Sequence, residues 1–559
     1  MVSAKEHGFN FRNFLVCWAV SLGQLGFGYP SSIIGPVLGE PSFLQAMSLV
    51  DSSGIPSAKQ NQLIGAINGV FQAGGFIGIL MTSWILDKYG RKMSSVYCAV
   101  LGLLGGSLLC GARDVTMFIV GRFFAGAGAW GFLACSADRT GRVAPIYTSE
   151  LSPAHLRGLF VGMNGVNVAF GYSLASYMGM AFFYAKEPAL QWRGPLGIAL
   201  VWPILTLVIL MFVPESPRWL LMKGRIDEAR DVIFKLHTSK HDPEELFAHE
   251  EFSQMQAQSN LENSLDSSWR ALFQRRSYRK RLLIASSFGF IGQSTAVLVI
   301  NNYGPTIYKS LGFDTKDQLA LQCGSNTTAA VFNFLGAAVM DRFGRRPLIL
   351  LSLLGCAVAL AIETAMVALY AESGTNKAGL SAGVFALYLF PAVYAMGIDV
   401  AGYTFFSELF PNHIRAKGVC VVIAVIALTD LVYLEVSATA FAEIGWKYYL
   451  VRLLYYFSSK LFLSLIYLQV FIIVTVLGTM AMYFVLPETK GIPLEDMAKL
   501  FGDTDEVILD GEEVDGAKLS SLDANSNSKG TELGLPASNA GTKSNTEIRH
   551  EEHADNIQA

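Results

Sequence analysis

Apolar runs of about 20 residues follow one another along most of the chain, and this succession constrains its fold more than any other feature. A helix of that length crosses the hydrocarbon core of a bilayer, and backbone groups in lipid must bond within their own segment. Six runs precede a polar stretch, residues 214–281, and six follow it. The predicted helices lie near residues 14–35, 62–86, 93–112, 115–149, 158–184, 194–213, 282–308, 318–340, 347–371, 380–406, 416–441 and 453–486.

The composition agrees with a chain whose surface faces lipid. Of its 559 residues, 52% are hydrophobic and only 16% are charged, whereas soluble proteins carry about 25% charged residues. A net charge of −3 gives no indication of nucleic-acid binding. The seven cysteines show no metal-ligand spacing, so we expect buried thiols, no metal and no cofactor. The sequence contains no GxGxxG motif, P-loop or nucleophile–base set, and an enzyme is therefore not expected.

Basic residues predict the orientation of the chain in the membrane. They gather in alternate loops, as in the run from Arg275 to Arg281, while the loops between these carry few cations. The positive-inside rule then places both termini and the central loop in the cytoplasm, and we expect a multi-pass protein of the cell membrane. Few aromatic residues follow Phe501, which predicts a largely disordered tail. The predicted parts are a terminus (1–13), a six-helix bundle (14–213), a helical loop domain (214–281), a second six-helix bundle (282–486) and a tail (487–559).

A short charged turn occurs twice. LDKYGRKM begins at Leu86, between the second and third spans, and MDRFGRRP begins at Met340, between the eighth and ninth. These places are equivalent in two six-span halves, so the repeat indicates an internal duplication. Two such halves around a central cavity are a transporter architecture with the substrate near the midplane. The sequence therefore predicts an all-α membrane protein of two pseudo-symmetric six-helix bundles; simple membrane anchors would explain one copy of the turn but not two in register.

Further motifs recur at matching places. PIYTSELSPAHLRG follows the fourth span and FFSELFPNHIRAKG the tenth, while PESPRWL follows the sixth and PETKG the twelfth. With GRFFAGAG at Gly121, this set resembles the sugar porter branch of the major facilitator superfamily over roughly residues 10–500. The resemblance implies alternating access between two bundles, and two cytoplasmic charge networks that close and open with it. Exposed ion pairs are weak enough to be reversible. The first network would comprise Asp87, Arg91, Glu150, Arg157 and Glu215, and the second Asp341, Arg345, Glu408, Arg415 and Glu488.

The positions that bind sugar in this family are largely altered here. Pro30 stands where the family has an aspartate in its first span, and Gly165 replaces a glutamine in the fifth. Amide and aromatic side chains suit the hydroxyls and ring of a sugar, although each amide has the alternative of a helix–helix hydrogen bond. We expect a neutral sugar, with a polyol, a cyclitol or a quinate-like acid as alternatives. The expected substrate-binding residues are Gln293, Asn302, Tyr303, Tyr403 and Asn164.

Proton coupling needs another group, because Pro30 cannot titrate. Carboxylates inside membrane spans are costly and are functional candidates by default; here they are Asp399, Asp430, Glu435 and Glu363. Asp399 lies four residues from Tyr403 and shares its helix face. We therefore expect Asp399 to carry coupling or substrate contact, with Arg122, which matches the family's span-four arginine, as the second coupling candidate. A transporter without coupling, and a nutrient sensor on a transporter fold, are the alternatives.

Two segments make their spans too long. Arg122 and Glu150 are 28 residues apart, about 42 Å of helix, whereas the hydrocarbon core is only about 30 Å thick. Removing Cys135 to Arg142 restores the expected spacing, and removing Arg452 to Gln469 leaves one ordinary twelfth span. We predict that neither segment belongs to the working transporter, as retained intron or mis-spliced sequence would explain. The alternatives are a real polar loop in the first case and a tilted or re-entrant helix in the second.

Overall fold

The computed structural model describes residues 11–51, 56–135, 157–237, short stretches between 248 and 260, 268–370, 377–444, 470–490 and residue 501. The chain divides into two compact units, Met1–Asp503 and Thr504–Ala559, and every described element belongs to the first. Helix is the only regular structure among the described residues, which confirms the predicted all-α fold. The two suspected extra segments lie outside the described residues, apart from Cys135 at the end of a helix.

The first span of the N-terminal half is broken into short helices. Pro30 and Pro36 each remove a backbone donor from it, and it runs as α1 (Phe11–Ser21), η1 (Leu22–Gln24), α2 (Leu25–Ser32) and α3 (Ile34–Gly39). The half continues with α4 (Pro41–Ala46), α5 (Ala58–Tyr89), α6 (Arg91–Cys110), α7 (Val115–Cys135), α9 (Arg157–Phe183), α10 (Pro188–Ile198) and α11 (Val201–Phe212).

The C-terminal half repeats this order after three short helices, α12 (Pro217–Met222), α13 (Ile226–His237) and α15 (Trp269–Gln274). Its own elements are α16 (Arg276–Gln293), α17 (Val297–Ser310), α18 (Thr315–Phe343), α19 (Arg345–Tyr370), α20 (Lys377–Tyr394), the π-helical η2 (Ala395–Asp399), α21 (Val400–Leu409), α22 (Asn412–Ile444) and α23 (Val470–Val485).

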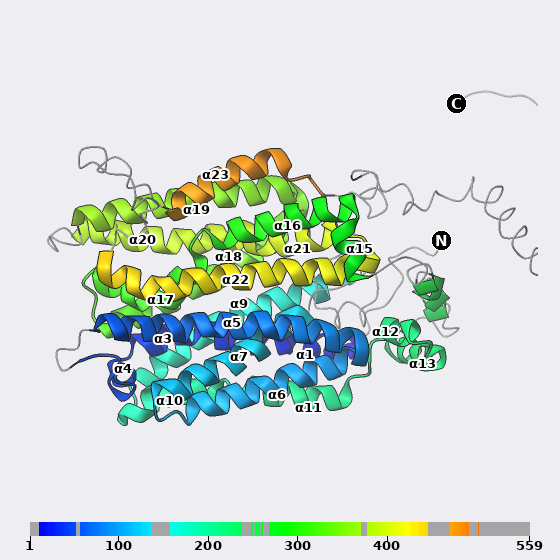
Figure 1. Cartoon of the computed structure of the whole chain (residues 1–559), viewed down its shortest axis with the longest axis horizontal. Helices are drawn as coiled ribbons and strands as arrows, with labels where there is room; N and C mark the ends of the chain where they lie inside the picture. Colours follow the sequence, from blue (N-terminus) through cyan, green and yellow to red (C-terminus); the bar gives the residue numbers. More distant parts are fainter. Residues whose placement is uncertain are drawn as a thin grey trace, which may run out of the picture. The chain divides into compact units, whose positions relative to one another are not determined.

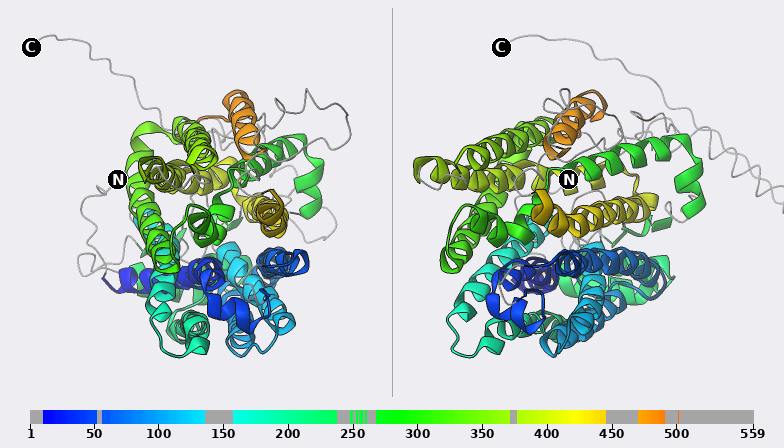
Figure 2. Two further views of the ribbon diagram at one scale, coloured as in Figure 1. Left: turned by 90° about the vertical axis from the view of Figure 1, so that its left-hand side faces the viewer. Right: turned by 60° about the vertical axis from the view of Figure 1, so that its left-hand side comes forward.

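The two halves form separate layers that meet along four main helix pairs. In Figures 1 and 2 the blue and cyan helices of the N-terminal half lie on one side, and the green to orange helices of the C-terminal half on the other. The main pairs across the junction are α5 with α22, α9 with α18, α3 with α17, and α3 with α18. Gly65 permits the first of these, because a Cβ there would lie 2.3 Å from the carbonyl oxygen of Glu435. These pairs are where the bundles can move against each other.

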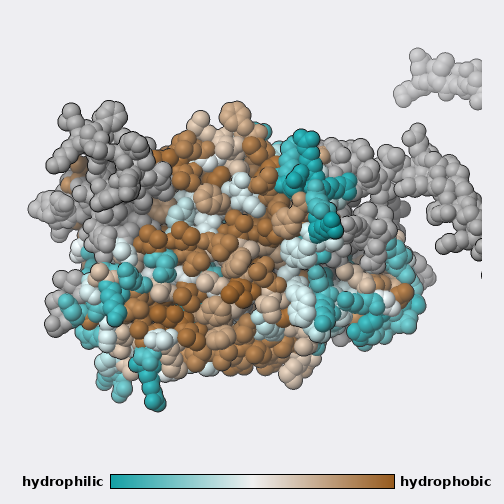
Figure 3. Space-filling model, in the orientation of Figure 1, coloured by the Kyte–Doolittle hydropathy of each residue, from teal (hydrophilic) through white to brown (hydrophobic). Residues whose placement is uncertain are grey.

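The outer surface of the helices is apolar. Eight helices among the described residues are long and apolar enough to cross a membrane. Figure 3 shows a broad hydrophobic surface over the helices, with hydrophilic residues gathered towards their ends. Large side chains such as Phe212 and Phe484 are 80% and 81% exposed, which a soluble protein would avoid. The chain is therefore an integral, multi-pass membrane protein.

Candidate functional site

The two repeated turns have the same geometry. Gly90 and Gly344 adopt φ of 96° and 91°, a backbone conformation that a side chain strains. A Cβ on Gly90 would also lie 2.6 Å from a carboxylate oxygen of Glu215, and one on Gly344 would lie 2.8 Å from that of Glu488. Each glycine therefore provides both the turn and the space for a carboxylate. We call the end of the bundles that carries these glycines the GR-turn end.

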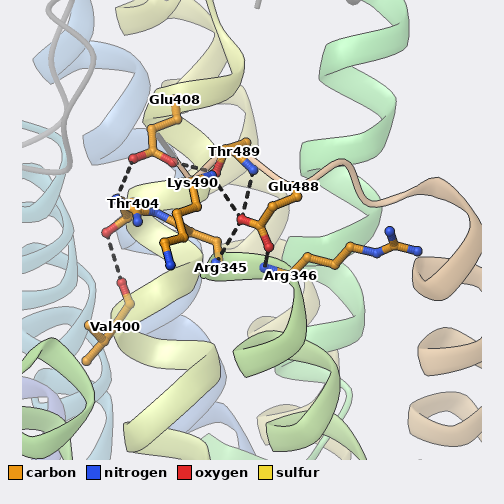
Figure 4. Close-up of polar contacts among 8 residues, drawn as sticks. All are labelled: Arg345, Arg346, Val400, Thr404, Glu408, Glu488, Thr489 and Lys490. Carbon is orange, nitrogen blue, oxygen red and sulfur yellow. Dashed lines mark hydrogen bonds and ion pairs between the residues drawn. The ribbon is translucent and has the colours of Figure 1, made fainter. Parts of the chain in front are cut away.

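Each carboxylate binds the first turn of a helix. Glu215 accepts the backbone N–H groups of Arg91 at 3.0 Å and Lys92 at 3.2 Å, at the start of α6. Glu488 does the same for Arg345 at 3.0 Å and Arg346 at 3.2 Å, at the start of α19 (Figure 4). A negative charge at this position satisfies orphan donors and complements the helix dipole.

The C-terminal turn also holds a shielded ion pair. Arg345 contacts Glu408 at 3.0 Å, and the two side chains are only 11% and 13% exposed. The hydroxyl of Thr489 donates to the other oxygen of Glu408 (Figure 4). The start of α19, the end of α21 and the loop after α23 are thus joined, and all three belong to the C-terminal bundle.

The other predicted members of the charge networks are placed only in part. Asp87 is half-buried at the end of α5 and has no polar partner among the described residues. Arg415 is fully buried, and its Nε donates to the carbonyl of Phe410 at 2.9 Å. Glu150 and the side chains of Arg157 and Asp341 lie outside the described residues.

A pocket in the C-terminal bundle brings together two of the predicted site residues. Gln293 and Asp399 line it, with Tyr394, Phe288 and Phe406 among the other walls. The amide of Gln293 donates to the hydroxyl of Tyr394 at 3.5 Å. Asp399 is partly exposed and accepts a hydrogen bond of 2.6 Å from the amide of Asn333. The pocket therefore offers amide, hydroxyl and carboxylate groups against aromatic walls, which is the chemistry that binds sugars and polyols.

Two breaks in helices shape this pocket. Between α16 and α17, Ala296 has a left-handed φ of 71°, so the seventh span changes direction directly after Gln293. In the tenth span, the π-helical η2 ends on Asp399. The Ser352 hydroxyl accepts the N–H of Ile398 at 3.2 Å, which supports the wider turn. π-Helical turns are frequent at functional sites.

The remaining predicted substrate residues do not line this pocket. Asn302 is buried, and its Oδ1 has no hydrogen-bond partner among the described residues. Tyr303 is also buried, and its hydroxyl donates to the carbonyl of Leu434 at 3.1 Å. The side chains of Asn164 and Tyr403 lie outside the described residues.

Arg122 lies in the N-terminal bundle, away from the pocket. Its Nε donates to the carbonyl of Ile67 at 3.0 Å, and a terminal nitrogen donates to the carbonyl of Pro30 at 3.3 Å. The guanidinium also lies over the ring of Phe71, 4.1 Å from its centroid. Arg122 therefore binds the backbone of the residue that replaces the family's aspartate.

Neutral side chains join the two bundles on the other side of the pocket. The amide nitrogen of Asn326 donates to Ser176 at 2.5 Å and to Ser32 at 3.4 Å, both in the other bundle. Ser32 donates to Asn301 at 3.4 Å, and Gln322 donates to both Asn301 and Asn326 at 3.4 Å. We call these five residues the neutral clasp. They lie between the pocket and the end of the bundles opposite the GR turns.

The sequence analysis missed Tyr394, Asn333 and the neutral clasp. One signal could have found part of this set. Gln322, Asn326 and Asn333 recur at spacings of four and seven along the eighth span, which places them on one helix face. Polar residues on one face of a membrane helix indicate an interior or cavity-lining side.

Comparisons with known proteins agree with this geometry. The family described as "Sugar (and other) transporter" matches residues 16–501. The relatives include the MFS-type transporter criB of Aspergillus cristatus, 27% identical over 85% of this chain and 90% of its own length. A probable polyol transporter of Arabidopsis thaliana is 28% identical (78% and 84%), and a probable quinate permease of Aspergillus flavus is 26% identical (88% and 89%).

A solved structure shares the fold. The major facilitator superfamily proton:xylose symporter XylE, bound to 6-bromo-6-deoxy-D-glucose, superposes with a TM-score of 0.69 at 22% identity, over 88% of this chain and 100% of that one. The predicted twelve-helix, two-bundle architecture is thereby confirmed.

Proposed function

We propose that this chain, which belongs to the sugar (and other) transporter family, carries a small polyhydroxylated solute across a membrane by alternating access. The observation that carries the proposal is the pocket itself. It combines Gln293, Asp399 and Tyr394 with aromatic walls, and it lies in one of two bundles that meet along a few helix pairs.

The solute is a neutral sugar or a polyol. Relatives named as polyol and sugar transporters support this class, and relatives named as quinate permeases support a polyhydroxylated acid as the alternative. The amide of Gln293 and the hydroxyl of Tyr394 can donate to and accept from ring hydroxyls. The ring of Phe288 or Phe406 can cover an apolar face of the sugar.

The GR-turn end faces the cytoplasm, together with both termini. The excess of Lys and Arg in the loops at this end supports that orientation. The neutral clasp then lies on the outer side of the pocket, so the clasped arrangement closes the outer path. The charge networks at the two GR turns hold the cytoplasmic ends of the helices.

Asp399 is the group for proton coupling, if transport is coupled. It is a carboxylate in a membrane span at the pocket wall, and carboxylates in such places commonly relay protons. Arg122 is the weaker coupling candidate, because its described contacts are backbone carbonyls and an aromatic ring rather than an acid.

Uptake into proteoliposomes tests the proposal. The purified chain should take up labelled xylose, glucose or sorbitol in a saturable manner, and each unlabelled solute should compete. Binding without uptake would instead support a nutrient sensor. A pH gradient should accelerate uptake by the parent chain but not by Asp399→Asn; equal acceleration of both would exclude Asp399 from coupling.

A further inference from the structure

Asn333 of α18 has a fixed amide orientation. It is 7% exposed, and its Nδ2 donates to the Oδ2 of Asp399 at 2.6 Å. An ionised carboxylate can only accept in such a contact, so the amide turns its NH2 group towards Asp399 when Asp399 is ionised. Its oxygen, Oδ1, must then point away from Asp399.

That oxygen lies near Gly165 of α9, which belongs to the other bundle and is exposed. A Cβ added to Gly165 would lie 3.8 Å from Oδ1 of Asn333 and would meet no other heavy atom within 4 Å. Asn333 thus lies between Asp399, which lines the pocket, and the space beside Gly165.

We propose that Asn333 and Asp399 act as one specificity-determining pair, which accepts hydrogen bonds from two hydroxyl groups of the solute and rejects solutes that carry a carboxylate. This inference rests on the proposed function and narrows it to neutral polyhydroxylated solutes. The reason is the direction of the hydrogen bonds. One amide hydrogen is used within the pair, so Oδ1 of Asn333 and the second oxygen of Asp399 remain as acceptors.

Two acceptors beside the negative charge of Asp399 discriminate between the alternative substrates. Hydroxyl groups donate to these acceptors, and two neighbouring hydroxyls of a sugar or polyol can do so together. A carboxylate on the solute has no hydrogen to donate, and the negative charge of Asp399 would repel it. Like charges at close range strongly lower the affinity for such a solute. A quinate-like acid therefore loses contacts that a neutral ring of the same size makes.

The backbone around the pair is built to hold it. Gly336, on the same helix as Asn333, allows η2 to approach, because a Cβ there would lie 2.4 Å from the carbonyl oxygen of Met396. Gly397 leaves the space that Ser352 fills, because a Cβ added to Gly397 would lie 2.4 Å from the Cβ of Ser352. The first contact holds α18, and the second holds α19, against the π-helical turn that ends on Asp399.

Equilibrium binding tests the inference without involving proton coupling. The full chain in detergent is titrated at one pH with xylose, glucose, sorbitol and quinate. We expect the best neutral solute to bind at least 30-fold more tightly than quinate. Asp399→Asn should reduce this ratio of affinities, neutral solute to quinate, at least tenfold. Asn333→Leu should weaken binding of the neutral solute about tenfold.

Two further variants separate recognition from folding. Thr328→Val removes a hydroxyl from the same helix that donates only to the carbonyl of Gly324 at 2.9 Å, and it should leave the ratio unchanged. Gly165→Ala leaves both members of the pair intact but narrows the space beside Oδ1, and it should weaken binding two- to fivefold.

The outcomes distinguish the two proposals. Unchanged neutral affinity in both Asn333→Leu and Gly165→Ala, or an unchanged ratio in Asp399→Asn, would overturn the pair and leave transport standing. Tighter binding of quinate than of every neutral solute would also overturn it. A parent chain that neither binds nor carries any of these solutes would overturn the proposed function, and the inference with it.

Discussion

The two ends of the bundles are held by different chemistry. At the GR-turn end the described contacts are ionic and lie within one bundle, as when Glu488 binds the start of α19 and Arg345 pairs with Glu408. Towards the opposite end, the contacts of the neutral clasp cross between bundles, with Asn326 bound to Ser32 and Ser176. Charge is used where a bundle must stay rigid, and neutral groups are used where two bundles must separate.

The energies fit this division. A hydrogen bond to a charged group contributes about 1.5–3 kcal/mol, whereas a neutral one contributes about 1 kcal/mol. A few neutral bonds hold the bundles together by an amount that solute binding can overcome. That the two cytoplasmic charge networks close and open with transport stays a prediction.

The largest effect is expected from the carboxylates of the GR turns. Glu488→Ala removes an acceptor from the backbone N–H groups of Arg345, Arg346, Thr489 and Lys490. We expect a loss of roughly 3–5 kcal/mol in stability, from two or more charge-assisted hydrogen bonds, measured by thermal unfolding in detergent.

The matched variants sharpen this test. Glu488→Gln keeps an acceptor and should lose about half as much. Glu215→Ala, the equivalent change in the other half, should match Glu488→Ala to within about 1 kcal/mol if the halves are equivalent. Unfolding temperatures equal to the parent would show that the carboxylates do not hold the bundles.

Glu40 is an exception to the neutrality of the opposite end. It follows α3, outside the membrane span, and is 1% exposed with neither carboxylate oxygen hydrogen-bonded among the described residues. Burial raises the pKa of this carboxyl from 4.5 to about 7. Because the folded pKa is the higher one, stability is greatest at low pH and falls as pH rises from about 4.5 to 7. The total loss is on the order of 3 kcal/mol.

Glu40→Gln should remove this pH dependence. Between pH 5.5 and 8.5 the parent should lose roughly 2 kcal/mol more stability than the variant, read as the difference between their unfolding curves. Glu187→Gln, an exposed carboxylate at the same end, should follow the parent. Parallel curves for Glu40→Gln and the parent would mean that Glu40 ionises without cost.

A smaller effect is expected from the neutral clasp. Asn326→Leu removes its central amide, and a loss of about 1 kcal/mol should raise the open population about fivefold. Cys323 offers a native probe, because it is 3% exposed and lies 4.0 Å from the sulfur of Met180 across the α9–α18 junction. Maleimide labelling of Cys323 should quicken about fivefold in Asn326→Leu, with Cys323→Ser as the control. An unchanged rate would mean that the clasp does not hold the bundles together.

The sequence predicted the parts of this comparison unequally. The spans, the two halves and the repeated turns follow from hydropathy and from motifs that recur in register, and the fold agrees. The clasp was not predicted, because the partners of Asn326 depend on how α9 packs against α18. The rotation of a half-span is equally hard to predict from sequence. Tyr303 was expected to contact the substrate, and this stays a prediction; its hydroxyl donates to the carbonyl of Leu434. The left-handed Ala296 precedes the helix that carries Tyr303.

Ala296 gives the smallest effect, at the point that joins the two ends. α16 leads from the GR-turn end to the pocket, and α17 continues to the opposite end against α3. A non-glycine residue with φ of 71° costs about 1–2 kcal/mol, part of which glycine's freedom in the unfolded chain offsets. Ala296→Gly should therefore stabilise the chain by about 1 kcal/mol, seen as a higher unfolding temperature. Ala285→Gly, equally buried but within α16, should destabilise it by about as much. If both glycine substitutions destabilised the chain equally, the backbone at Ala296 would carry no strain, and Ala296→Gly should then leave the labelling rate of Cys323 unchanged. If the strain is real, its relief should also change that labelling rate, because the break at Ala296 positions α17 against α3.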